Sequence, residues 1–64
     1  MDLQEISQKI LSYAEKHEGA TSWQIKTALR LQLSDTYIAL GMLAAQGKVK
    51  LEAQGINYKV APVK

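Results

Sequence analysis

Apolar residues recur every three or four positions near the start of the chain, the spacing of one face of a helix. This stripe consists of Leu3, Ile6, Ile10, Tyr13, Ala14 and His17. Ahead of it, Asp2 and Glu5 have the spacing of a capping box, in which each side chain accepts from a backbone N–H at the helix start. The pattern predicts a first helix over residues 3–17, which ends before Gly19.

Two shorter helices are predicted in the middle of the chain. Residues 20–22 read as a short extended segment that ends in the capping residue Ser22. A second helix over residues 23–30 would present Ile25, Ala28 and Leu29 to the core. The following turn, residues 30–33, has no glycine, so its geometry is open. We expect the third helix over residues 35–46, capped by Ser34 or Asp35 and ended by Gly47 in a left-handed conformation.

After Gly47 the hydrophobic period changes from that of a helix to that of a strand, because apolar and polar residues alternate. Two such runs, residues 48–53 and 56–61, flank Gln54-Gly55, which predicts a hairpin with a two-residue turn. This register pairs Val49 with Val60, Leu51 with Tyr58, and Ala53 with Ile56, all on one buried face. Lys50 and Lys59 then lie side by side on the wet face. Residues 20–22 are a candidate third strand.

The order of helix, extended segment, helix, turn, helix and hairpin is an α+β arrangement that resembles the winged helix-turn-helix, here as a single domain over residues 1–64. Leu40, Leu43 and Gly47-Lys48-Val49 resemble its core leucine pair and its Gly-x-apolar entry into the wing. Residues 37–44, YIALGMLA, resemble a family of small, uncharacterised bacterial proteins that are little more than one winged helix. The wider class implies double-stranded DNA binding by the third helix and the wing.

The third helix has apolar residues on both sides. On a helical wheel, Thr36, Ala39, Leu40 and Leu43 cluster on the side that the family pattern assigns to the core. The opposite side is formed by Ile38, Gly41, Met42 and Ala45, with Tyr37 on its flank. A helix that enters the major groove needs side chains that hydrogen-bond to base edges and phosphates, and this face offers almost none.

This second apolar face predicts a protein contact, most simply the formation of a homodimer. The protein would then be a non-catalytic winged-helix module with a regulatory role. Gly41 and Ala45 allow two helix backbones to approach, and Ile38 and Met42 fill the gaps between them. Two other coverings remain open. A different protein could bind the face, or the hairpin and residues 60–63 of the same chain could fold over it.

The charges support one alternative function, a DNA-binding regulator of transcription. The net charge is only +2, but the second helix and the wing carry five cations that could contact phosphates: Lys26, Arg30, Lys48, Lys50 and Lys59. Such binding is weak and falls with salt. The short Gln54-Gly55 turn also leaves little loop to reach a minor groove. The same cations could equally form a solvated surface.

The composition gives no sign of an enzyme. There is no cysteine and one histidine, His17, so neither a thiolate metal site nor a nucleophile–histidine pair is indicated. Trp23 and Tyr58 read as packing residues. We expect no catalytic site, no cofactor, no metal and no small-molecule substrate. The chain starts without a cationic leader and has no long apolar run, so we expect no secretory signal, no membrane span and a cytoplasmic protein.

Overall fold

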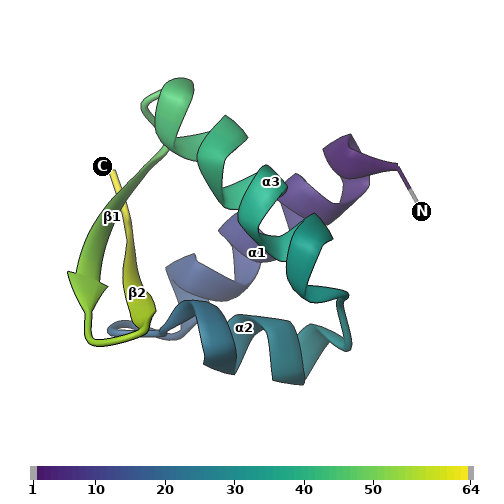
Figure 1. The fold of residues 1–64 in the computed structure, drawn as a ribbon. Coiled ribbons are helices and arrows are strands. Elements are labelled where there is room, and N and C mark those ends of the chain that lie inside the picture. Colours follow the sequence, from purple (N-terminus) through teal and green to yellow (C-terminus); the bar gives the residue numbers. More distant parts are fainter. Residues whose placement is uncertain (1, 64) are drawn as a thin grey trace.

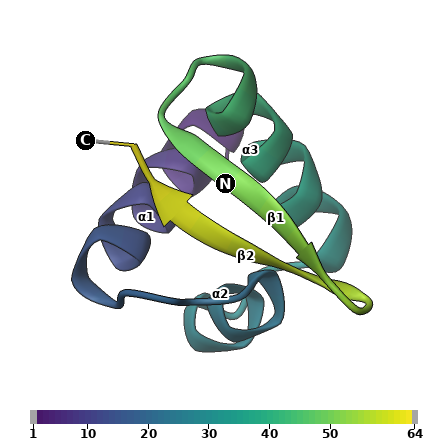
Figure 2. The same cartoon turned by 90° about the vertical axis from the view of Figure 1, so that its left-hand side faces the viewer.

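The computed structural model describes residues 2–63, which form three helices followed by an antiparallel hairpin (Figure 1). The elements are α1 (Leu3–Lys16), α2 (Ser22–Leu29), α3 (Leu33–Ala45), β1 (Val49–Gln54) and β2 (Asn57–Pro62). The hairpin stands at one side of the helices. Figure 2 shows β1 beside α3, whereas β2 lies against α1 and α2. This arrangement confirms the predicted α+β architecture.

The hydrophobic core lies where the three helices meet beneath the hairpin. Its buried members come from every element: Ile6, Ile10, Ala14, Ala20, Ile25, Ala39, Leu40, Leu43, Val49 and Val60. The predicted core side of α3 is confirmed, because Thr36 is buried together with the three apolar residues of that side. Ala28 was expected inward but is exposed. It lies on the solvent side of α2, a short helix whose buried residues are Ser22 and Ile25.

The first two helices begin at side-chain caps. The Asp2 carboxylate accepts a hydrogen bond from the Glu5 backbone N–H at 2.9 Å, as the capping box predicts. At α2 the cap is Thr21, whose hydroxyl oxygen accepts from the Gln24 N–H at 3.1 Å. The prediction that Ser22 caps this helix was therefore wrong by one residue. The buried Ser22 hydroxyl instead accepts from the Tyr58 N–H at 3.1 Å and ties α2 to the hairpin.

The start of α3 differs from the prediction, because the helix begins at Leu33 with Gln32 as its N-cap and has no side-chain cap there. Ser34 and Asp35 lie inside the first turn. There the negative charge of Asp35 interacts favourably with the positive end of the helix dipole. The end agrees with the prediction. Gly47 has φ +72, its N–H donates to the Ala44 carbonyl, and the next N–H, of Lys48, reaches Leu43. These two bonds form a Schellman motif.

The turn between α2 and α3 is a second Schellman motif, built without glycine. Arg30 has φ 55, and its N–H donates to the Thr27 carbonyl at 3.3 Å. The Leu31 N–H donates to the Lys26 carbonyl at 3.0 Å. A residue with a Cβ in this left-handed conformation costs about 1–2 kcal/mol. The surrounding hydrogen bonds therefore hold Arg30 in a conformation that glycine adopts freely.

The hairpin register is shifted by two residues from the prediction. Leu51 pairs with Val60, Ala53 with Tyr58, and Glu52 with Lys59. The turn residues are Gly55 and Ile56, with Gly55 at φ +62 in the first central position, as in a type II′ turn. Because side chains alternate with a period of two, this shift leaves Leu51 and Val60 on the predicted face. Ile56 was expected in the buried face but is exposed at the turn.

The third strand exists as a single bridge. Thr21 pairs with Lys59, and the Val60 N–H donates to the Ala20 carbonyl at 2.9 Å. β2 therefore lies between β1 and the loop that joins α1 to α2. With the Ser22 hydrogen bond, this pairing fixes the position of the wing on the helices.

Candidate interaction surface on the third helix and the wing

The outward side of α3 is open to solvent in its centre. Ile38 is 51% exposed, and Gly41 and Ala45 beside it are exposed as well. Met42 is partly buried, because it shares a hollow between α1 and α3 with Ser7 and Leu11. Of the four residues predicted on this side, three therefore form one exposed strip, and Met42 turns toward α1.

Within residues 2–63, no close contact requires a glycine at position 41. A Cβ built on Gly41 would meet no atom within 4 Å. In a helix interior, glycine is about 1 kcal/mol less favourable than alanine. The missing side chain opens the α3 surface beside Ile38 without serving the packing of the same chain.

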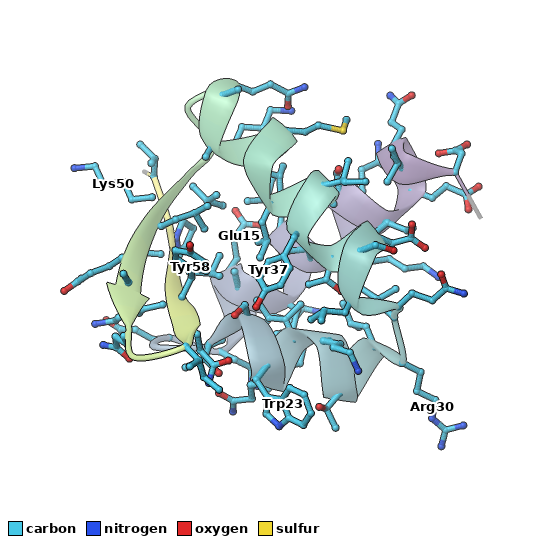
Figure 3. The ribbon with its side chains drawn as sticks, in the orientation of Figure 1. Glu15, Trp23, Arg30, Tyr37, Lys50 and Tyr58 are labelled. Carbon is cyan, nitrogen blue, oxygen red and sulfur yellow. The ribbon has the colours of Figure 1, made fainter. Side chains whose placement is uncertain are left out.

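On the wing side of α3, two tyrosines meet across the gap to the hairpin. The Tyr37 ring on α3 and the Tyr58 ring on β2 are edge to face, with centroids 6.1 Å apart and planes at 84°. Figure 3 shows both rings between α3 and the hairpin. They border a groove of about 410 Å³, whose lining residues are Tyr37, Leu40, Gly41, Leu51, Ile56 and Tyr58. We name this the α3–wing groove.

Sequence reasoning missed the wing half of this surface. With the turn placed at Gln54-Gly55, Ile56 and Tyr58 were expected in the buried face of the hairpin. In the observed register Ile56 is 90% exposed and Tyr58 is 41% exposed. The usable signal was the large apolar residue directly after Gly55, at a position where turns usually carry small or polar residues.

The C-terminal residues of the described chain do not cover α3. Val60 is buried in the core, and the Val63 N–H donates to the Lys48 carbonyl at 2.9 Å, next to the start of β1. This path runs along the hairpin. Ile38 remains exposed, so intrachain covering by the hairpin or by residues 60–63 is not what the described structure contains.

The cations of the DNA-binding alternative lie on several parts of the molecule. Lys26 lies over the Trp23 ring, with its Nζ 5.1 Å from the ring centroid. Figure 3 places Arg30 at the far end of α2 and Lys50 on β1, at opposite sides of the fold. A phosphate backbone would have to pass from one side to the other to contact both.

The remaining two cations lie in other hollows. Lys48 borders the hollow between α1 and α3 that Met42 also lines, beside Gln4 and Gln46. Lys59 borders a hollow together with Glu15 and Glu18 of α1 and its C-terminal loop. Two carboxylates at the same hollow offset the attraction of Lys59 for an anion. The structure does not gather the five cations into one patch.

Within residues 2–63, no three His, Cys, Asp or Glu side chains are placed to share a metal ion. His17 is exposed and stacks on Tyr13, with ring centroids 4.1 Å apart. Among the described helices, none combines the length and apolar character needed to cross a bilayer.

The fold is similar to that of a solved MarR protein from Peptoclostridium difficile. The superposition has a TM-score of 0.86 at 18% sequence identity, and it covers 97% of this chain and 42% of that one. The likeness confirms the winged-helix fold predicted from the sequence. The chain thus spans less than half the length of that protein. No family model and no curated protein matches the sequence.

Proposed function

We propose that this winged helix is a non-catalytic protein-contact module that pairs with a second copy of itself through the outward face of α3. The observation that carries the proposal is the half-exposed Ile38 on a strip with Gly41 and Ala45. No charged side chain belongs to this strip. Two copies can therefore meet there without burying a charge, although each chain has a net charge of +2.

Energetics support a pair of modest affinity. Full burial of an exposed isoleucine contributes about 1.5–3 kcal/mol, and Ile38, at 51% exposure, can gain about half of that. A two-fold axis uses each contact twice, because the same patch serves both copies. Association costs roughly 4–15 kcal/mol in lost translational and rotational freedom, so the strip needs close backbone approach and further contacts. Gly41 would allow that approach. A dimer contact therefore explains the glycine at this position, which packing within the chain does not.

DNA binding by α3, which the winged-helix class implies, receives little support from these residues. The exposed centre of the helix offers aliphatic groups, and its first turn carries the negative charge of Asp35. Placing such a face in a major groove would desolvate base edges without replacing their hydrogen bonds. We expect binding to duplex DNA to be weak, insensitive to sequence and sensitive to salt.

Sedimentation equilibrium of the full chain, from micromolar to millimolar concentration, tests the proposal. The wild-type chain should approach the dimer mass as concentration rises. Ile38→Lys should remain a folded monomer, whereas Val63→Lys, a matched change at another exposed apolar residue, should still dimerise. Gly41→Ala should weaken the dimer while raising the stability of the monomer. A wild-type chain that stays monomeric at millimolar concentration would refute the homodimer.

A heteronuclear NMR titration with mixed-sequence duplex DNA tests the alternative. Weak shifts that vanish with salt and shrink in Lys50→Ala or Lys59→Ala agree with the proposal. Nanomolar binding to one sequence, with shifts centred on residues 37–45, would show that α3 reads DNA and that the proposal is wrong.

A further inference from the structure

Exposed large apolar side chains gather on α3 and the wing. Seven are exposed among the described residues, and five of these belong to α3 or the hairpin: Leu33, Tyr37, Ile38, Ile56 and Tyr58. Leu33 and Tyr37 are one helical turn apart, so they continue the same side of α3 toward Tyr58. An apolar surface that crosses from a helix to a wing in this way is typical of a binding site.

Ile56 is the most exposed of these residues, at 90%. It is the second residue of the two-residue turn, next to Gly55. A serine or asparagine at this position would serve the turn equally well. Ile56 therefore contributes almost nothing to the packing of its own chain and presents its whole side chain at the tip of the wing.

The α3–wing groove begins at this tip. Leu40 and Leu51 line it together with the edge-to-face pair of Tyr37 and Tyr58, and Ile56 borders it. Its volume of about 410 Å³ lies within the ~300–1,000 Å³ of sites that hold small ligands. The groove has room for one apolar side chain, and no charged residue lines it.

The α3 strip alone is too small for a stable dimer. A standard interface buries roughly 800 Å² on each partner, close to a fifth of the 4356 Å² surface of this fold. The strip offers two small residues and the half-exposed Ile38, and the partly covered Met42 beside it adds little. Full burial of a tyrosine hides about 150–250 Å², so Tyr37, at 36% exposure, adds roughly 50–90 Å². The missing area lies on the wing.

We infer that the two copies exchange wing tips, with Ile56 of each copy seated in the α3–wing groove of the other. This inference rests on the proposed homodimer and extends it to the wing. Gly41 borders the groove and also lies on the α3 strip, so one continuous surface includes both contacts. Because Gly41 and Ile56 both line the groove, a two-fold axis beside Gly41 would bring each wing tip close to the groove of the other copy. The wing thus acts as the anchor of a protein contact.

The decisive variant is Ile56→Ser, compared with the matched control Val63→Ser, by sedimentation equilibrium of the full chain. Because each dimer loses two isoleucine contacts, Ile56→Ser should raise the dimer Kd about 100-fold. Val63→Ser should change the Kd by less than about twofold. The thermal midpoint of both variants should match the wild type under conditions where all are monomeric, since neither side chain belongs to the core.

The outcomes separate the two proposals. A monomeric wild-type chain overturns both of them. A wild-type dimer that Ile38→Lys breaks and Ile56→Ser leaves unchanged overturns the wing exchange and keeps the α3 contact. A dimer weakened by Ile56→Ser and by Ile38→Lys, but not by Val63→Ser, supports both.

Isotope-filtered NMR on mixed labelled and unlabelled chains gives an independent check. Each Ile56 borders the groove of its own chain, so the filter must distinguish contacts within a copy from contacts between copies. The exchange predicts intermolecular NOEs from the Ile56 methyl groups to the Tyr37 and Tyr58 rings. A dimer that shows only intramolecular NOEs from these methyl groups overturns it.

Discussion

The ring of Tyr37 meets the ring of Tyr58 edge to face, with centroids 6.1 Å apart, although the two residues are 21 positions apart in the sequence. One ring stands on α3 and the other on β2. Both rings line the α3–wing groove, so the contact joins the helix to the wing across it.

A double-mutant cycle with Tyr37→Leu and Tyr58→Leu should reveal a coupling free energy of about 0.5–1.5 kcal/mol, because leucine keeps the apolar contact and loses the ring geometry. Urea denaturation, at a protein concentration where the chain is monomeric, measures this coupling free energy. Tyr13→Leu combined with Tyr58→Leu is the control and should be additive within about 0.5 kcal/mol. Additivity in both cycles would mean that the rings merely lie near each other.

Ser22→Ala should lower the free energy of unfolding by about 1–3 kcal/mol. The Ser22 hydroxyl accepts from the Tyr58 N–H at 3.1 Å in a buried position, and alanine would leave that donor without its partner. Urea denaturation followed by circular dichroism measures the change. The exposed Ser12→Ala on α1 is the control and should not destabilise the fold. Equal effects of the two changes would mean that this hydrogen bond does not stabilise the attachment of the wing.

Arg30→Gly should raise the stability by about 1 kcal/mol, because glycine adopts the left-handed conformation of this residue without a steric penalty. For a domain of this size, that gain raises the thermal midpoint by about 4–8 °C. Gly47→Ala makes the opposite change at the equivalent position after α3 and should lower the midpoint. If Arg30→Gly also lowers it, the α2–α3 turn does not have the described backbone.

Ser7→Ala should stabilise the fold more than Ser12→Ala does. The Ser7 hydroxyl is buried and has no hydrogen-bond partner, whereas Ser12 lies on the exposed side of the same helix. Both changes gain helix propensity, but only Ser7→Ala also removes a buried hydroxyl, which is worth about 1–3 kcal/mol. The difference between the two thermal midpoints isolates that contribution. No difference would indicate that a water molecule satisfies the Ser7 hydroxyl.

The sequence was sufficient to predict which side of α3 is buried, whereas on α2 it wrongly placed Ala28 inward. On α3, the spacing of Thr36, Ala39, Leu40 and Leu43 placed them together in the core, where they are found. The same spacing left Ile38 outward, and it is half exposed. Side-chain period alone decides these assignments, so they do not depend on where a helix begins or ends.

The register of the hairpin could not be predicted in the same way. Alternation specifies which face each residue joins, but a shift of two residues preserves every face. Only the turn distinguishes Leu51 opposite Tyr58 from Leu51 opposite Val60. The prediction placed Gly55 second in the turn, and the structure places it first. Both positions suit a glycine, so the local sequence left two registers of similar plausibility.

The exposed apolar surface of α3 and the wing was predicted in part. The α3 strip followed from the helical wheel, but the partial covering of Met42 depends on the approach of α1, which no local pattern encodes. The start of α3 was misjudged because Ser34 and Asp35 are good capping residues, while the observed cap, Gln32, makes no side-chain hydrogen bond. The positions of the five cations likewise depend on how the elements pack.

The order of the strands determines which strand edge is open to pairing with another chain. β2 is paired on both sides, with β1 and at the Thr21 bridge, so the outer edge of the described sheet is β1. An unpaired strand edge is a template for fibrous aggregation, since further strands can add to it without limit. β1 is six residues long and carries Lys50 and Glu52. These charges oppose open-ended strand addition, which agrees with the proposed homodimer that uses the uncharged α3 strip and the wing tip instead.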